Sequence, residues 1–178
     1  MKKRVDLADF DIKFVGLCLG KHDFQFKIDS EFISKFQDAL IDKLDITLDF
    51  TLDKQSESLF LLDFNFSGSF ELECDRCLQN FSYPVKQNNR LILKVENGQD
   101  NLDDDVIFAS SNDIKVNIAE YVYEFVSLIV PMKKTCELIS KQCDKEMLKL
   151  LNNYSIQTRK EEQNTDNEWN ILKKLRNN

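Results

Sequence analysis

The chain has 178 residues, 42% of them hydrophobic, which is enough for one folded domain with a real core. A net charge of −7 argues against broad, unspecific binding to nucleic acid. The few glycines form no phosphate-binding loop pattern, and no apolar run is long enough for a signal peptide or a membrane span. We therefore expect a cytoplasmic protein with no membrane partner, whose five cysteines stay reduced.

Five stretches of the first half alternate between apolar and polar residues with a period of two, which predicts strands with one buried face: 10–14, 22–28, 44–53, 60–74 and 81–95. The first two flank a glycine and predict a hairpin, with Cys18 in its core. Gly68 interrupts the fourth stretch and predicts a bulge or a bend. Residues 97–113 are expected to form an acidic loop.

Helical spacing begins after that loop, with Asn117 as the expected N-cap and Pro131 as the stop. A shorter helix is expected around residues 145–151. The fold class is therefore α+β, an antiparallel β-sheet or partly closed barrel of about five strands followed by C-terminal helices. We expect one domain over residues 1–154, and a polar linker with a short amphipathic helix over residues 155–178.

The C-terminal helix is a candidate partner-binding element. Its apolar positions fall near one helical face, and basic residues lie beside them. The residues concerned are Trp169, Leu172, Lys173, Lys174 and Leu175. A lone tryptophan in a tail often anchors either its own domain or a partner, and the sequence leaves both possibilities open.

Four cysteines are candidate metal ligands. Cys74 and Cys77 form a C-x-x-C turn between two predicted strands, and Cys136 and Cys143 can complete a tetrahedral set for zinc. The spacing of the second pair is loose, so a core role for these thiols remains an alternative. A redox role is a further alternative, although a redox C-x-x-C normally opens a helix and this one is flanked by strands.

Catalytic groups are not evident. The only histidine, His22, is in phase with apolar neighbours on a predicted strand, which indicates a packed or rim residue rather than a base. The aspartates at 100–105 lack the spacing of a calcium loop. We therefore expect no enzyme activity and no small-molecule substrate.

Three blocks, in order, resemble the YceD family of large ribosomal RNA subunit accumulation proteins. They are the segment Cys74–Leu78, which follows an apolar strand, the helix and its end over 117–133, and the terminal segment 166–175. Cysteines 136 and 143 fill the positions where the family has Cys or His and then Cys. The terminal block departs from the family pattern at Asn167 and Glu168, where Pro and Arg are common.

The resemblance implies a non-enzymatic bacterial factor that supports accumulation of large-subunit rRNA and assembly of the large ribosomal subunit. Its partner would be a large-subunit precursor, through either the rRNA or a ribosomal protein. The alternative from the residues alone is a zinc-binding or redox-responsive regulatory module.

Overall fold

The computed structural model describes residues 6–37, 43–96 and 105–154. The chain up to Cys143 forms one unit, and the unit that begins at Asp144 is described separately. Within the described residues, no helix combines the length and the apolar character needed to span a membrane. The predicted boundary at residue 154 adjoins residues that the structure does not describe and stays a prediction.

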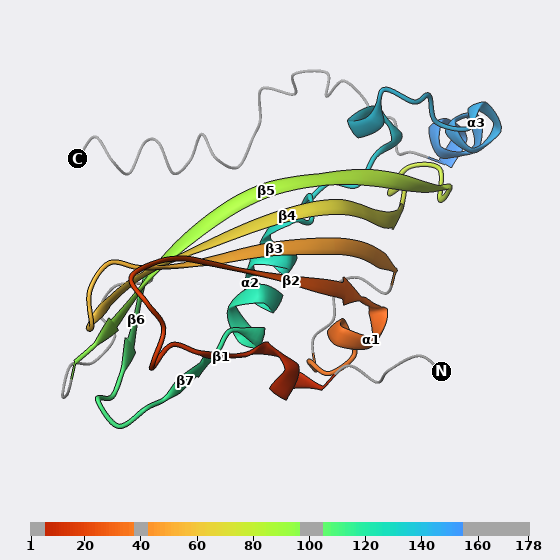
Figure 1. Ribbon diagram of the computed structural model, residues 1–178. Coiled ribbons are helices and arrows are strands. Elements are labelled where there is room, and N and C mark those ends of the chain that lie inside the picture. The colour runs from red at the N-terminus through yellow and green to blue at the C-terminus, as the bar shows by residue number, and fades with distance from the viewer. Residues whose placement is uncertain (1–5, 38–42, 97–104, 155–178) are drawn as a thin grey trace, which may run out of the picture. The chain divides into compact units, whose positions relative to one another are not determined.

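Within the described residues, the main sheet has five strands in the order β2-β3-β4-β5-β6 (Figure 1). The strands are β2 (Gly20–Asp29), β3 (Leu44–Lys54), β4 (Leu59–Glu73), β5 (Asn80–Val95) and β6 (Val106–Ala109). Neighbours are antiparallel except β5 and β6, which are parallel. The predicted α+β class is therefore confirmed. The sheet is open rather than closed into a barrel, and β6 lies within the stretch that was expected to be an acidic loop.

The predicted hairpin between residues 10–14 and 22–28 is wrong. Strand β1 (Asp11–Lys13), which follows the 3-10 helix η1 (Leu7–Phe10), pairs with β7 (Lys115–Asn117) in a separate two-stranded sheet. Asp11 explains why β1 pairs with β7. Its carboxylate accepts hydrogen bonds from the side chains of both Lys115 and Asn117, and these bonds lower the pKa of Asp11. The alternation of apolar and polar residues along a strand does not reveal a pairing partner about a hundred residues away.

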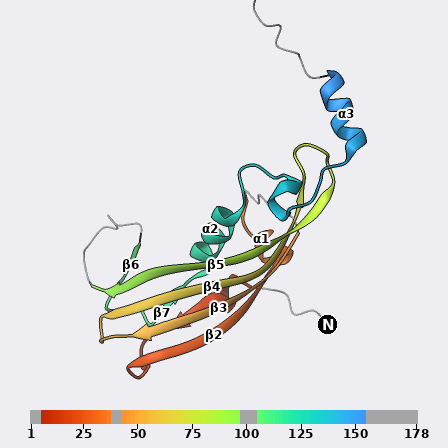
Figure 2. The same cartoon turned by 90° about the horizontal axis from the view of Figure 1, so that it is seen from above.

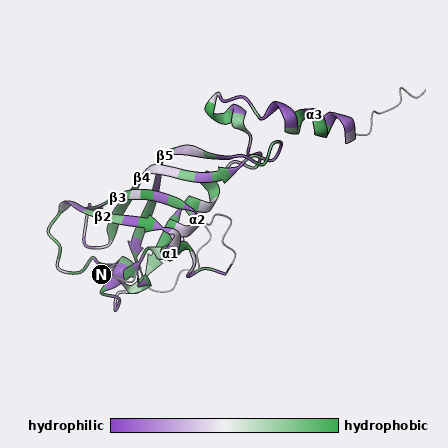
Figure 3. Cartoon of the chain, turned by 90° about the vertical axis from the view of Figure 1, so that its right-hand side faces the viewer, coloured by the Kyte–Doolittle hydropathy of each residue, from purple (hydrophilic) through white to green (hydrophobic). Residues whose placement is uncertain are grey.

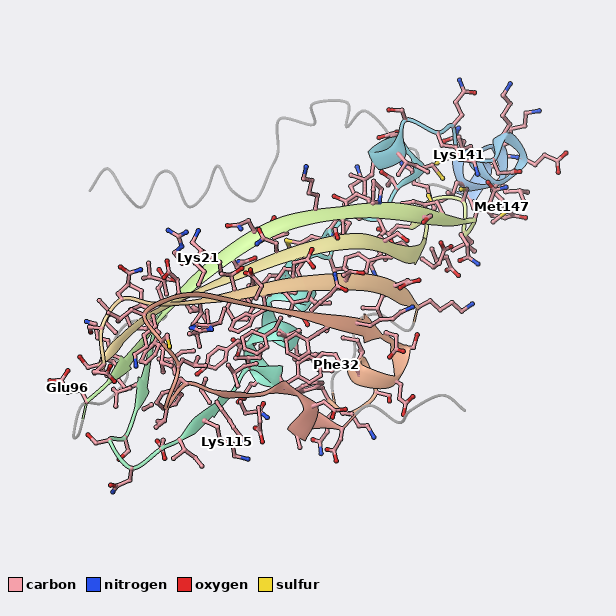
Figure 4. All side chains as sticks on the ribbon, viewed as in Figure 1. Lys21, Phe32, Glu96, Lys115, Lys141 and Met147 are labelled. Atoms are coloured by element: carbon pink, nitrogen blue, oxygen red, sulfur yellow. The ribbon has the colours of Figure 1, made fainter. Side chains whose placement is uncertain are left out.

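One face of the main sheet carries the core. Alternate side chains of β3 and β4, such as Phe50 and Phe64, are fully buried. Helix α2 (Ala119–Ile129) covers this face, and the Phe125 ring lies 5.3 Å from that of Phe64 (Figure 2). The short helix α1 (Ser30–Ile33), capped by Asp29, adds buried Phe32 to the same layer (Figure 4). The strict alternation of the sequence thus reflects one dry and one wet face.

The opposite face of the sheet is polar and held by cross-strand hydrogen bonds. Gln25 donates to Asp49 at 2.8 Å, and Thr51 donates to Asp23 at 2.7 Å. Arg90 donates two hydrogen bonds to the carboxylate of Asp63, of 2.6 and 3.1 Å. These cross-strand pairs give the polar side chains on the solvated face of the sheet their hydrogen-bond partners.

Two further predicted helices are confirmed in their described parts. The N-cap residue of α2 is Ile118 rather than the predicted Asn117, although the Asn117 side chain accepts a hydrogen bond from the backbone N–H of Ala119 at 2.9 Å. In the second unit, α3 (Lys145–Tyr154) begins after Asp144, whose carboxylate accepts from the N–H groups of Glu146 and Met147. Apolar and polar residues alternate around α3 (Figure 3).

Candidate metal centre

The C-x-x-C motif forms the turn between β4 and β5 at one end of the sheet. The N–H of Cys74 donates to the carbonyl of Gln79 at 3.0 Å, and the N–H of Leu78 donates to the carbonyl of Cys74 at 2.9 Å. Leu78 closes this turn with φ at 58°, a left-handed conformation uncommon for residues other than glycine. The turn holds both cysteine side chains buried.

The segment after α2 lies beside this turn. Asp75 makes two hydrogen bonds with Lys134, one from its own N–H to the Lys134 carbonyl and one from the Lys134 N–H to its carboxylate, both 2.7 Å. Arg76 forms an ion pair with Glu137. Both middle residues of the C-x-x-C motif therefore fasten the segment that carries the second cysteine pair.

The second pair is presented by the 3-10 helix η2 (Cys136–Ile139) and the loop that follows it, which contains Lys141 (Figure 4). Ser140 ends this helix with φ at 57° and returns the chain so that Cys143 faces the turn. Cys136 is fully buried and Cys143 is partly exposed. The predicted convergence of the four cysteines is thus confirmed.

The spacing of the four sulfurs fits a tetrahedral metal site. All four lie within 4.8 Å of one another, with Cys74 3.7 Å from Cys143 and Cys77 3.6 Å from Cys136. A tetrahedron with metal–sulfur bonds of about 2.3 Å separates its sulfurs by about 3.8 Å. The thiols are not disulfide-bonded. Four sulfur donors in such a set are the ligands of structural zinc sites.

The surroundings of the site shift the pKa values of Cys74, Cys136 and Cys143. Burial opposes ionisation of Cys74, but the backbone N–H groups of Cys77, Arg76 and Cys136 donate to its sulfur and lower its pKa to about 6. Burial, with hydrogen bonding to neighbouring thiols, raises the pKa of Cys136 to about 12. Burial also raises the pKa of Cys143. The thiolate form of Cys74 is therefore favoured, and ionisation of Cys136 and Cys143 would need a nearby cation.

The fifth cysteine is separate from this cluster. The prediction that Cys18 is core is wrong, because residues 14–19 form no strand and the Cys18 side chain is exposed. Its carbonyl lies 2.9 Å from Nε2 of His22, whose half-buried ring points toward the core side of β2 as predicted.

Sequence reasoning missed the contribution of Asp75, Arg76, Lys134 and Glu137. Their only signal was the charged character of the two middle residues of the motif, which solvation explains equally well. The predicted tail residues Trp169, Leu172, Lys173, Lys174 and Leu175 lie outside the described residues.

An open α+β sheet with four clustered thiols at one end defines a small protein with a candidate metal clip. The family described as large ribosomal RNA subunit accumulation protein YceD matches residues 62–176, and the chain belongs to that family. The match includes the C-x-x-C turn, α2 and the second cysteine pair. The searches of curated proteins and of solved structures return no match.

Proposed function

We propose that the chain is a non-enzymatic cytoplasmic factor that supports accumulation of large-subunit rRNA and assembly of the large ribosomal subunit. Membership of the YceD family carries this proposal. Its partner is a large-subunit precursor, engaged through the rRNA or a ribosomal protein, and it takes no small-molecule substrate. The net charge of −7 favours a defined contact with one part of the precursor over unspecific binding along the phosphate backbone.

The four cysteines serve this function as a zinc clip. Cys74, Cys77, Cys136 and Cys143 would hold the ion, which would supply no chemistry beyond its bonds to sulfur. Its position supports a structural role, because it would join the β4–β5 turn to the segment after α2. That segment already makes the Asp75–Lys134 and Arg76–Glu137 contacts, so the residues fit a closed structural site.

A second function, a redox-responsive module, is favoured by one observation. Two thiol pairs lie at 3.6 and 3.7 Å, and one member of the cluster, Cys74, has a pKa of about 6. The C-x-x-C motif however sits on a β-turn and not at a helix N-terminus, so it lacks the geometry of thioredoxin-like sites. Zinc content and thiol titration of protein purified under reducing conditions distinguish the two functions.

Depletion tests the main proposal. Loss of the protein is expected to lower large-subunit rRNA relative to small-subunit rRNA, because unassembled precursors are degraded. The ratio is measured by quantifying both rRNAs and both subunits during slow and fast growth, and a plasmid copy of the gene should restore it. An unchanged ratio in both regimes would contradict the proposal.

The tail gives a separate prediction. Replacing Trp169 by alanine is expected to weaken association with pre-ribosomal particles by about 2 kcal/mol if the side chain is an anchor for a partner. Lys160→Ala, in the preceding linker, is the matched control. A variant that keeps its melting temperature, its ribosome-fraction profile and its rRNA ratio would show that the tryptophan is dispensable.

A further inference from the structure

Strand β2 leaves one edge of the main sheet open. All ten of its residues pair with β3 on one side, and among the described residues no backbone hydrogen bond is made on the other. The ribbon of β2 is the outermost of the main sheet in Figure 2. An open edge of this length is a template for another strand, so its side chains decide what can pair with it.

The polar residues of β2 form a self-complementary series. Alternate positions on the solvated face read Lys21, Asp23, Gln25, Lys27 and Asp29. If a second copy of β2 runs antiparallel with Gln25 opposite Gln25, each lysine meets an aspartate. Lys21 then faces Asp29, and Asp23 faces Lys27, in both directions. Opposite charges directly across two strands stabilise the pairing, and like charges oppose it.

Neighbouring registers lack this complementarity. A pairing centred on residue 24 sets Lys21 against Lys27, and one centred on residue 26 sets Asp23 against Asp29. Centres at 23 or 27 place a charged residue opposite its own copy. Shifts that would put a residue of one face opposite the other face are excluded by the pleat of the strand. Registers centred on residue 22 or 28 also set a lysine against an aspartate, but they pair only part of β2. Among registers that pair the strand along its length, the charge series therefore favours the one centred on Gln25.

The core face of β2 supports the same arrangement. Phe24 and Phe26 are only partly buried, although Phe26 stacks on Phe10 with ring centroids 4.9 Å apart, whereas Phe50 on the neighbouring strand is fully buried. In the register centred on Gln25, Phe24 of one copy faces Phe26 of the other. Each ring would cover the apolar surface that its counterpart leaves in water, and cross-strand aromatic pairs stabilise sheets.

We propose that two copies of this chain pair through their β2 edges, antiparallel and centred on Gln25, and so join their two main sheets into one. The contacts that these side chains already make are compatible with this pairing. Both side chains of the Lys27–Asp45 ion pair, at 3.3 Å, are exposed, and Thr51 donates a hydrogen bond to only one carboxylate oxygen of Asp23. Asp29 caps α1 through Oδ1 alone and keeps its second oxygen for Lys21. The backbone and the phenylalanines supply affinity, and the charges fix the register.

Charge exchange at one cross-strand pair tests the proposal. In the full-length chain, Lys27→Asp places two aspartates opposite each other at two symmetry-related positions, and Asp23→Lys places two lysines there. Each variant alone is expected to weaken dimerisation about tenfold, as measured by sedimentation equilibrium. An equimolar mixture of the two variants is expected to recover the wild-type dissociation constant, because every such pair is again opposite in charge.

Lys86→Asp is the control, since Lys86 is an exposed lysine of β5 on the same face, away from this edge, and should leave dimerisation unchanged. A wild-type chain that stays monomeric at its highest soluble concentration would overturn the proposal. The β2 edge would then be a candidate for pairing with a strand of a different protein. Variants that dimerise like the wild type, or a mixture that fails to recover, would overturn it equally, because the interface or its register would then lie elsewhere.

Discussion

Replacing Cys77 by serine is expected to abolish stoichiometric zinc binding and to open the segment 134–143 while the main sheet stays folded. A serine hydroxyl is a poor ligand, and the site has no fifth donor among the cysteines of the chain, since Cys18 is exposed and separate from the cluster. The sheet has its own core of phenylalanines and α2, so the loss should be local.

Native mass spectrometry and hydrogen exchange measure the two effects. Zinc-loaded wild-type protein is expected to protect four cysteines from alkylation and to leave Cys18 reactive, and chelation should expose all five. Cys77→Ser should lose the zinc mass and the protection of the Lys134 N–H, which donates to Asp75. Cys18→Ser is the matched control and should behave like the wild type. A wild-type chain that takes up no zinc after reduction and refolding would refute the metal site.

The sequence predicted those parts of the fold in which one face of a strand is buried. Strands β3, β4 and β5 coincide with the predicted stretches to within a few residues, because alternate burial imposes a period of two along each strand. Short strands carry no such signal. Strands β6 and β7 have four and three residues; β7 is defined by its pairing with the distant β1, and β6 by a parallel pairing with β5 that leaves no periodic pattern.

The four cysteines of the candidate site were predictable from the sequence, but the contacts that support them were not. A C-x-x-C pair with two more cysteines downstream supplies the four thiols that a tetrahedral metal site needs. The sequence therefore predicts that these four side chains come together in the fold. The fastening of the site depends on tertiary contacts of Asp75 and Arg76 that no local pattern specifies. Cys18 was mispredicted. Its apolar neighbours predicted a buried side chain, but Cys18 lies in a loop and is exposed.

Among the glycines that the structure describes, Gly68 is the one at which an added methyl group is expected to destabilise the fold most. Its φ is 152°, which residues with a side chain rarely adopt. A Cβ atom there would lie 2.1 Å from the carbonyl oxygen of Asp45 and 2.7 Å from Cα of Ile46, both backbone atoms of β3. Because Ile46 is opposite Gly68 in the sheet, the two strands would have to separate.

Gly68→Ala is therefore expected to destabilise the fold by about 3 kcal/mol or more, combining the backbone strain with the overpacking. For a chain of this size, that loss corresponds to a fall in melting temperature of roughly 10 °C. Gly20→Ala is the matched control, because Gly20 also has a positive φ, 109°, but no atom lies within 4 Å of the added Cβ. The difference between the variants isolates the steric term, measured by thermal and urea unfolding. If Gly68→Ala costs no more than Gly20→Ala, β3 and β4 can part without loss, and the close approach at Gly68 does not hold the sheet together.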